Sequence, residues 1–297
     1  MTVVVGYLPH KGGRGSLDLG LQLAHALGEP MAVVTVVPRQ WSTPSLAKVD
    51  AEFADYARQV GEEAERQSKE YLSDSTVVVE TSFHAVAGRS VTSALVQTAE
   101  SEGASVLVVG SSDDGEPGRI VVGSTADKLL HSSPVALALS PGGFRSDAVD
   151  GFSRITCAFS DNESSVRVVE RAAPLAARIG APLRIASFGV RGTTMYPPEV
   201  GLSAEDSVLD SWAEQASAAQ QALRTDGVIG SDVDCVIATG PGWSESMDSI
   251  DWRPGEIFAL GSSTAGPLAR VFLGSRAAKL IRHSPVPVVV LPYEPRA

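Results

Sequence analysis

The chain has 297 residues, of which 43% are hydrophobic and 20% are charged. These fractions are ordinary for soluble globular proteins and exclude a disordered or fibrous chain. The formal net charge of -11 would repel the phosphate backbone of a nucleic acid, so nucleic acid is not an expected partner. The length is about twice that of a typical domain of roughly 150 residues and therefore predicts two domains.

Neither a membrane segment nor a metal site is expected. The first apolar run, TVVVGYL, has no basic leader and is too short for a signal-peptide core or a membrane span. The two cysteines, Cys157 and Cys235, lie in apolar runs with no CxxC pair and no His at ligand spacing. We expect a cytoplasmic protein without an anchor, with two buried free thiols.

The first half of the chain alternates predicted strands and helices. TVVVGYL predicts a strand, and Ser16 to Leu27 a helix that ends at Gly28. The run MAVVTVV predicts the second strand, and Ala47 to Leu72 a long amphipathic helix. The segments TVVVETSF and VLVVG, separated by a shorter helix, predict two further strands, and VALALS predicts the last.

The second half follows the same order. RITCAFS predicts a strand, followed by a helix with Ser164 or Ser165 as its N-cap and Gly180 at its end. A helix over Ala204 to Leu223 precedes the strand DVDCVIAT. The strands IFALG and VPVVVLP complete this half.

An internal repeat is directly visible. The segment from Val106 to Pro141 aligns without gaps on the segment from Ile257 to Pro292. The identical pairs are Gly110/Gly261, Ser111/Ser262, Ser112/Ser263, Gly115/Gly266, Gly123/Gly274, Ser124/Ser275, Lys128/Lys279, Leu129/Leu280, Ser133/Ser284 and Pro134/Pro285. The chain is therefore built from two related units.

Apolar strands that alternate with helices indicate a parallel sheet covered on both faces. Right-handed crossovers then give an α/β fold with two doubly wound, Rossmann-like, five-stranded domains related by a pseudo-two-fold axis. We expect residues 1–144 and 152–297 to form the domains, because Gly, Pro, Ser and Asp cluster between them in SPGGFRSDAVDGFSR. The prediction is of one sheet in each domain and not of a single continuous sheet.

The loop after the fourth strand of each half is the candidate binding element. The strand ends at Gly110 or Gly261, and a Gly-Ser pair opens the next helix. A helix N-terminus offers unpaired N–H groups and partial positive charge, and glycine allows a phosphate to approach the backbone. The hydroxyls of Ser124, Thr125 and Ser275 are candidates to cap the helix and to donate to a phosphate.

With these loops in view, the sequence resembles the universal stress protein family, across nearly the whole chain and twice. The family loop has the form G-x-x-G-x₉-G-[ST], and its glycines and final hydroxyl cradle the ribose and phosphates of ATP. The outer spacing matches from Gly110 to Gly123-Ser124 and from Gly261 to Gly274-Ser275. The resemblance also implies that the last strands meet, so Val135 to Leu139 and Val286 to Leu291 are expected at the interface.

Two departures bear on the ligand. The second loop glycine is replaced by Asp113 in the first half and by Thr264 in the second. The family's ATP binders usually carry an Asp after the first strand, where this chain has Leu8 in the first half. The second half has Ser160 at that position, followed by Asp161, which reaches a ribose hydroxyl if the loop shifts by one residue. A carboxylate at position 113 repels a polyphosphate, so the second domain is expected to be the better ATP site.

Three classes of function remain open. The leading hypothesis is a cytoplasmic stress-response module whose two domains pair within one chain, with degenerate ATP sites and the option of a homodimer. The second is a structural or interaction protein of the same fold without a ligand. The third is an enzyme, but the sequence contains no P-loop, G-x-S-x-G elbow, HExxH or nucleophile-base set. No catalytic residue is assigned, and slow ATP hydrolysis is left open.

Overall fold

The computed structural model describes residues 1–9, 11, 13–39, 47–112, 116–146, 151–191, 198–262, 271 and 274–292. Among the described residues, the first half contains five strands and four helices. In chain order these are β1 (Thr2–Gly6), α1 (Gly15–Leu27), β2 (Met31–Pro38), α2 (Ala47–Ser73), β3 (Thr81–Gly88), α3 (Val91–Ser101), β4 (Ala104–Gly110), α4 (Ser124–Leu129) and β5 (Ala136–Ser140).

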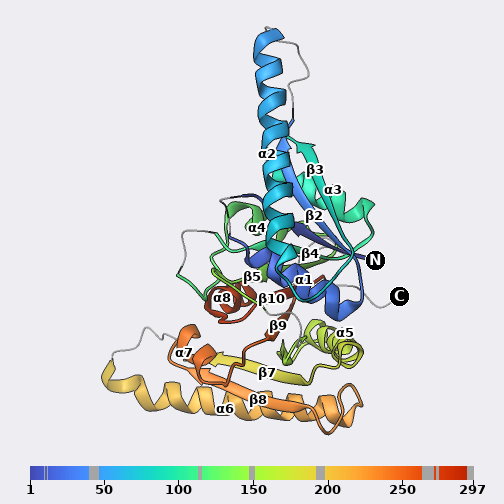
Figure 1. Cartoon of the computed structure of the whole chain (residues 1–297). Coiled ribbons are helices and arrows are strands. Elements are labelled where there is room, and N and C mark those ends of the chain that lie inside the picture. The colour runs from blue at the N-terminus through green and yellow to red at the C-terminus, as the bar shows by residue number, and fades with distance from the viewer. Residues whose placement is uncertain are drawn as a thin grey trace.

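The second half repeats this order of elements, as the sequence predicts (Figure 1). Its elements are β6 (Arg154–Ala158), α5 (Glu163–Ile179), β7 (Leu183–Val190), α6 (Pro198–Thr225), β8 (Asp234–Gly240), α7 (Trp243–Asp248), β9 (Glu256–Gly261), α8 (Ser275–His283) and β10 (Val288–Leu291).

Each half has the predicted doubly wound strand order, but the halves share one sheet. The ten strands follow the order β3-β2-β1-β4-β5-β10-β9-β6-β7-β8. All pairs within a half are parallel, whereas β5 and β10 pair antiparallel through Leu137↔Val290, Ala138↔Val289 and Leu139↔Val288. The predicted contact of the last strands is confirmed. The prediction of two separate sheets is wrong, because two apolar edge strands that meet across a two-fold axis also satisfy their backbone hydrogen bonds.

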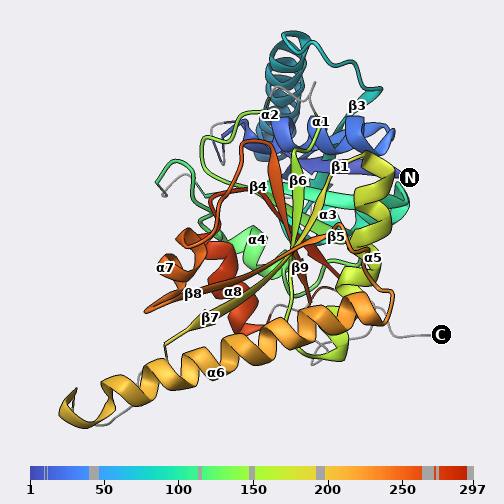
Figure 2. The same cartoon turned by 90° about the horizontal axis from the view of Figure 1, so that it is seen from below.

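Helices cover both faces of the sheet, as predicted (Figures 1 and 2). Buried residues of α1, α2, α5 and α6 join one hydrophobic cluster, and those of α3, α4, α7 and α8 join the other. Strand residues contribute alternately to the two clusters: Val3 and Val5 face the first, and Val4 faces the second. Each cluster runs across both halves of the chain, so the two halves share their cores.

Several local predictions are confirmed and others are corrected. Gly28 and Gly180 end α1 and α5 in the left-handed conformation, with φ of 65° and 70°. The cap of α5 is Asn162, whose side chain accepts a hydrogen bond from the Ser165 amide, and not Ser164 or Ser165. Cys157 is buried and free as expected, and its burial raises the pKa of the thiol to about 12. Cys235 is free but only half-buried.

Candidate functional site

A cleft of about 520 Å³ opens at the carboxyl ends of β1 and β4 in the first half. A ligand site is expected in this position of a doubly wound sheet, where the strand order reverses. The cleft is lined by Gly6, Tyr7, Leu8, Lys11, Ser16, Val34, Val36, Val91, Leu95, Val109, Gly110, Ser111, Ser112, Gly123, Ser124, Thr125 and Ala126. All four predicted site residues of this half, Gly110, Gly123, Ser124 and Thr125, therefore line one cleft.

The ends of the glycine loop are held together by serine. The hydroxyl of Ser111 accepts a hydrogen bond from the Val121 amide at 2.7 Å, and the Ser112 amide donates to the Val121 carbonyl at 2.9 Å. A Cβ built on Gly123 would lie 3.5 Å from the Cβ of Ser112. These contacts bring the start of α4 back beside the end of β4, so the backbone of both loop ends faces the cleft.

The helices that follow the two loops begin at glycine. Gly123 and Gly274 are the N-caps of α4 and α8, with extended backbone, and among the described residues neither helix has a side-chain cap hydrogen bond. Ser124 and Ser275 are the first helical residues, and Thr125 is the second, so the prediction that these hydroxyls cap the helices is wrong. Within the described ranges, the first-turn N–H groups of these helices therefore donate to no side-chain cap from the N-cap residue, and uncapped helix N-termini are where proteins commonly bind anions.

The first turns of these helices differ in charge. Asp127 lies in the first turn of α4, whereas the first turn of α8 contains no acidic residue and includes Arg276. A carboxylate near the start of a helix partly neutralises the positive electrostatic potential that would otherwise attract a phosphate. The start of α8 is therefore electrostatically the more favourable of the two for an anionic ligand.

The described part of the second site includes both ends of its loop. Ser160 and Asp161 follow β6, with Ser160 half-buried and Asp161 exposed. The Ser262 amide donates to the Leu291 carbonyl at 2.9 Å, as the Ser111 amide donates to Ser140 at 3.0 Å in the first half. Thr264 and Gly266 lie outside the described residues, as do Asp113 and Gly115 in the first half.

Gly261 has a packing role that the sequence does not reveal. A Cβ at this position would lie 2.4 Å from Cγ2 of Val168 in α5, closer than real Cβ atoms approach. The glycine is therefore required by the contact between β9 and α5, whether or not a ligand binds. This reading weakens Gly261 as evidence for a nucleotide site.

Sequence reasoning missed the apolar walls of the first cleft. Val34 and Val36 come from β2, and Val91 and Leu95 come from α3. Each resembles an ordinary core residue in the sequence, so no local signal identifies it. Ser111 and Ser112 could have been found, because the same pair follows the glycine in both repeats.

The first strand of the first half leads into apolar surroundings. Leu8 lines the cleft at the position where the resemblance noted above implies an Asp in nucleotide-binding members. The hydroxyl of its neighbour Tyr7 lies 3.4 Å from Oε1 of Gln67, and burial raises the pKa of the Tyr7 side chain. The described lining of this cleft contains one charged side chain, Lys11, and no carboxylate that could bind a ribose.

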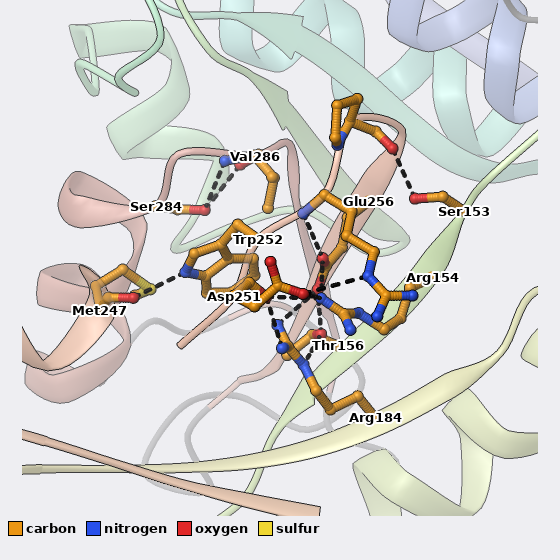
Figure 3. A network of polar contacts seen from close by, with 12 residues as sticks. Ser153, Arg154, Thr156, Arg184, Met247, Asp251, Trp252, Glu256, Ser284 and Val286 are labelled. Atoms are coloured by element: carbon orange, nitrogen blue, oxygen red, sulfur yellow. Dashed lines mark hydrogen bonds and ion pairs between the residues drawn. The ribbon is translucent and has the colours of Figure 1, made fainter. Parts of the chain in front are cut away.

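A charged cluster lies near the amino ends of β6, β7 and β9, at the edge of the sheet opposite the glycine loops (Figure 3). Glu256 in β9 is fully buried and accepts hydrogen bonds from Arg154 at 2.7 Å and Arg184 at 2.8 Å. Thr156 also donates to this carboxylate, and the guanidinium of Arg184 lies 5.2 Å from the ring centroid of Trp252. Burial of Arg184 lowers its pKa, against the opposing effect of Glu256. The buried carboxylate and the two buried guanidinium groups pair with one another. We therefore interpret this cluster as a structural element of the sheet and not as a ligand site.

Metal and membrane sites receive no support within the described ranges. There, no group of three or more His, Cys, Asp and Glu side chains is placed to hold a metal ion. No helix in this part of the chain is both long enough and apolar enough to cross a bilayer.

Comparison with known proteins identifies the family. The model of the universal stress protein family matches residues 1–141 and again residues 151–292. Universal stress proteins of Mycobacterium tuberculosis (strain H37Rv) and Mycobacterium bovis are each 47% identical over 292 residues, covering 98% of this chain and 100% of theirs. The crystal structure of a universal stress protein from Archaeoglobus fulgidus shares the fold, with a TM-score of 0.61 at 20% identity over 98% of both chains. The chain therefore belongs to the universal stress protein family, of which it is a tandem member.

Proposed function

We propose that this tandem universal stress protein is a cytoplasmic stress-response module that binds an adenine nucleotide such as ATP, with the second domain as the better site. The proposal assigns residues 1–144 and 152–297 to the two domains. The observation that supports it is the start of α8. This helix has a glycine N-cap, no side-chain cap hydrogen bond in the described structure and no acidic residue in its first turn. Such a helix end attracts phosphate through its free N–H groups and its dipole.

The residues expected to hold the nucleotide in the second domain come from three positions. Gly274 and Ser275 supply backbone N–H groups and a hydroxyl to the phosphates, and Gly261 begins the loop. Ser160 and Asp161 follow β6 at the same end of the sheet, where an exposed carboxylate suits a ribose hydroxyl. In the first domain, Gly110, Gly123, Ser124 and Thr125 form the corresponding, weaker site.

Calorimetric titration with ATP tests the proposal. Thr264→Gly restores the family loop and should strengthen binding, and Asp113→Gly should create or improve binding in the first domain by about tenfold, because one repulsive charge is removed. Ser275→Ala should weaken binding to the wild-type protein. The matched control is Ser124→Ala, which removes the equivalent hydroxyl from the weaker site and should leave the main binding event unchanged.

The ligand-free interaction protein is the second candidate, and the packing of Gly261 against Val168 favours it. If neither the wild-type protein nor the two glycine variants bind ATP, this second candidate replaces the first.

The proposal assigns no catalytic residue and no enzyme activity. Phosphate release from ATP in the same samples tests the slow hydrolysis that the sequence leaves open, and faster release in Thr264→Gly would locate it in the second domain. Pairing within one chain is compatible with a homodimer, which sedimentation would detect.

A further inference from the structure

Equivalent positions of the two halves can be matched through the register of the sheet. Ile155 pairs with Leu183 in the second half as Val3 pairs with Met31 in the first, with the same shift in residue number for both residues. The same shift holds at the carboxyl ends of β3 and β8, each of which ends at a glycine. The residues that line the first cleft therefore identify their counterparts around the second site.

The helices that follow β3 and β8 begin at equivalent residues. Helix α3 starts at Val91 and α7 at Trp243, at the same distance from the glycine that ends the preceding strand. A Cβ built on either glycine would clash with the following helix, at 2.9 Å from Ala94 in the first half and at 2.5 Å from Ser246 in the second. Each helix is thus packed closely on the end of its strand, and Trp243 takes the place of Val91.

Two aliphatic residues in the wall of the first cleft are replaced by aromatic residues in the second half. Val36 and Val91 line the first cleft, and their counterparts are Phe188 and Trp243. Both aromatic side chains pack against the hydrophobic cluster that contains Leu260 of β9, and both are only half-buried. An aromatic surface therefore remains accessible in the second half where the first half has valine.

Trp243 also lies beside the helix whose first turn carries the proposed phosphate site. Helix α7 packs against α8, and Figure 2 shows the two helices side by side. The Nζ atom of Lys279 in α8 lies 5.6 Å from the centroid of the Trp243 ring. Lys279 is about 6 Å along the helix from Ser275, at 1.5 Å per residue. A ribose separates the base of a nucleotide from its phosphates by a comparable distance.

We propose that Trp243 recognises the base of a purine nucleotide in the second site by stacking on it. This inference rests on the function proposed above, and it adds to the site a residue that the glycine-loop pattern does not contain. Stacking of a base on an aromatic side chain strengthens binding by about tenfold. The first site has Val91 at this position, which offers no aromatic face. The two halves therefore differ in recognition of the base as well as in charge.

Calorimetric titration with ATP, CTP and inorganic tripolyphosphate separates recognition of the base from recognition of the phosphates. Trp243→Leu keeps an apolar side chain and should weaken ATP by about tenfold while tripolyphosphate is unaffected. Trp243→Phe keeps a ring and should retain most of the affinity for ATP. The wild-type protein should prefer ATP to CTP, because the larger purine offers more area for stacking, and Trp243→Leu should reduce this preference. The matched control is Val91→Leu in the first half, which should leave the main binding event unchanged.

A second readout does not depend on affinity. ATP should quench the tryptophan fluorescence of the wild-type protein, and Trp243→Phe should abolish this quenching. ATP binding that Trp243→Leu leaves unchanged, or strengthens because the ring only fills the site, would overturn the inference and leave the nucleotide site standing. An equal loss of ATP and tripolyphosphate binding would also overturn it, since the ring would then act through α8 and not on the base. If neither ATP nor tripolyphosphate binds to any variant, the function proposed above fails as well.

Discussion

At the scale of single residues, equivalent positions of the sheet carry a charged cluster around Glu256 in the second half and apolar side chains in the first half. In the second half, Arg154, Arg184 and Glu256 form a buried charged cluster. The strand register places Thr156 opposite Arg184, as Val4 lies opposite Ala32 in the first half. Val4 and Ala32 are fully buried and apolar. The fold therefore accepts an apolar pair here, and the charges of the second half are stable only as a complete set.

Glu256→Gln should destabilise the second half strongly. The substitution keeps the size of the side chain but removes the buried counter-charge that two guanidinium groups share, which costs about 3–5 kcal/mol, and only the exposed carboxylate of Asp251, 3.6 Å from Arg154, remains nearby. Urea denaturation followed by circular dichroism measures the effect, and Arg253→Gln is the control. The Arg253 side chain is 56% exposed, so its loss should change stability by about 0.5 kcal/mol or less. A loss below about 1 kcal/mol for Glu256→Gln would contradict this account.

At the scale of elements, the limits of the sequence prediction have physical causes. The sequence predicts a strand over TVVVETSF, residues 76–83, whereas β3 covers Thr81–Gly88 and Val78 is 93% exposed. The partner strand decides this difference, because β2 begins at Met31 and Met31 pairs with Thr81. An apolar, β-branched run favours a strand, but without a neighbour it has no hydrogen-bonding partner.

The candidate site was also only partly predictable, because some of its residues are identified by local sequence and others reach it only through the fold. The repeat predicts the loop glycines and the helices that they begin, because the sequence encodes both locally. The walls of the first cleft were not predictable, since Val34 and Val91 reach it from β2 and α3 only after the sheet has formed. The role of Gly261 also depends on a contact with Val168, nearly a hundred positions earlier in the chain.

The cap of α5 provides a prediction at the same scale. The Oδ1 atom of Asn162 accepts a hydrogen bond from the Ser165 amide at 2.9 Å. Asn162→Ala should reduce the free energy of unfolding by about 1 kcal/mol, because a first-turn N–H loses its partner. Ser165→Ala is the matched control, since it retains the backbone amide and should have little effect. Thermal unfolding of the two variants distinguishes them, and a larger loss for Ser165→Ala would restore the serine cap that the sequence suggested.

At the scale of the whole molecule, the seam between the halves is more than a strand pair. Arg119 of the first glycine loop donates to the His283 carbonyl at the end of α8, at 2.7 Å. The amide of Val271, in the second loop, donates to the Ser133 carbonyl of the first half at 2.8 Å. Ile120 and Val271 occupy equivalent positions in the repeat, and both are buried. Each glycine loop is thus attached to the other half of the chain.

The continuous sheet leads to a prediction about hydrogen exchange. In two separate sheets, β5 and β10 would each be an edge strand, with half of its backbone groups unpaired. In this structure they lie at the centre, and the outermost strands are β3 and β8. Amides of Leu137 to Leu139 and Val288 to Val290 should therefore exchange at least about tenfold more slowly than those of β3 and β8, because the central strands open only when both halves come apart. Mass spectrometry of peptides from the exchanged protein measures all four strands in one sample, with β1, flanked by β2 and β4, as the internal standard for a protected strand. Exchange of β5 and β10 at the rate of β3 and β8 would show that the two halves are not joined in solution.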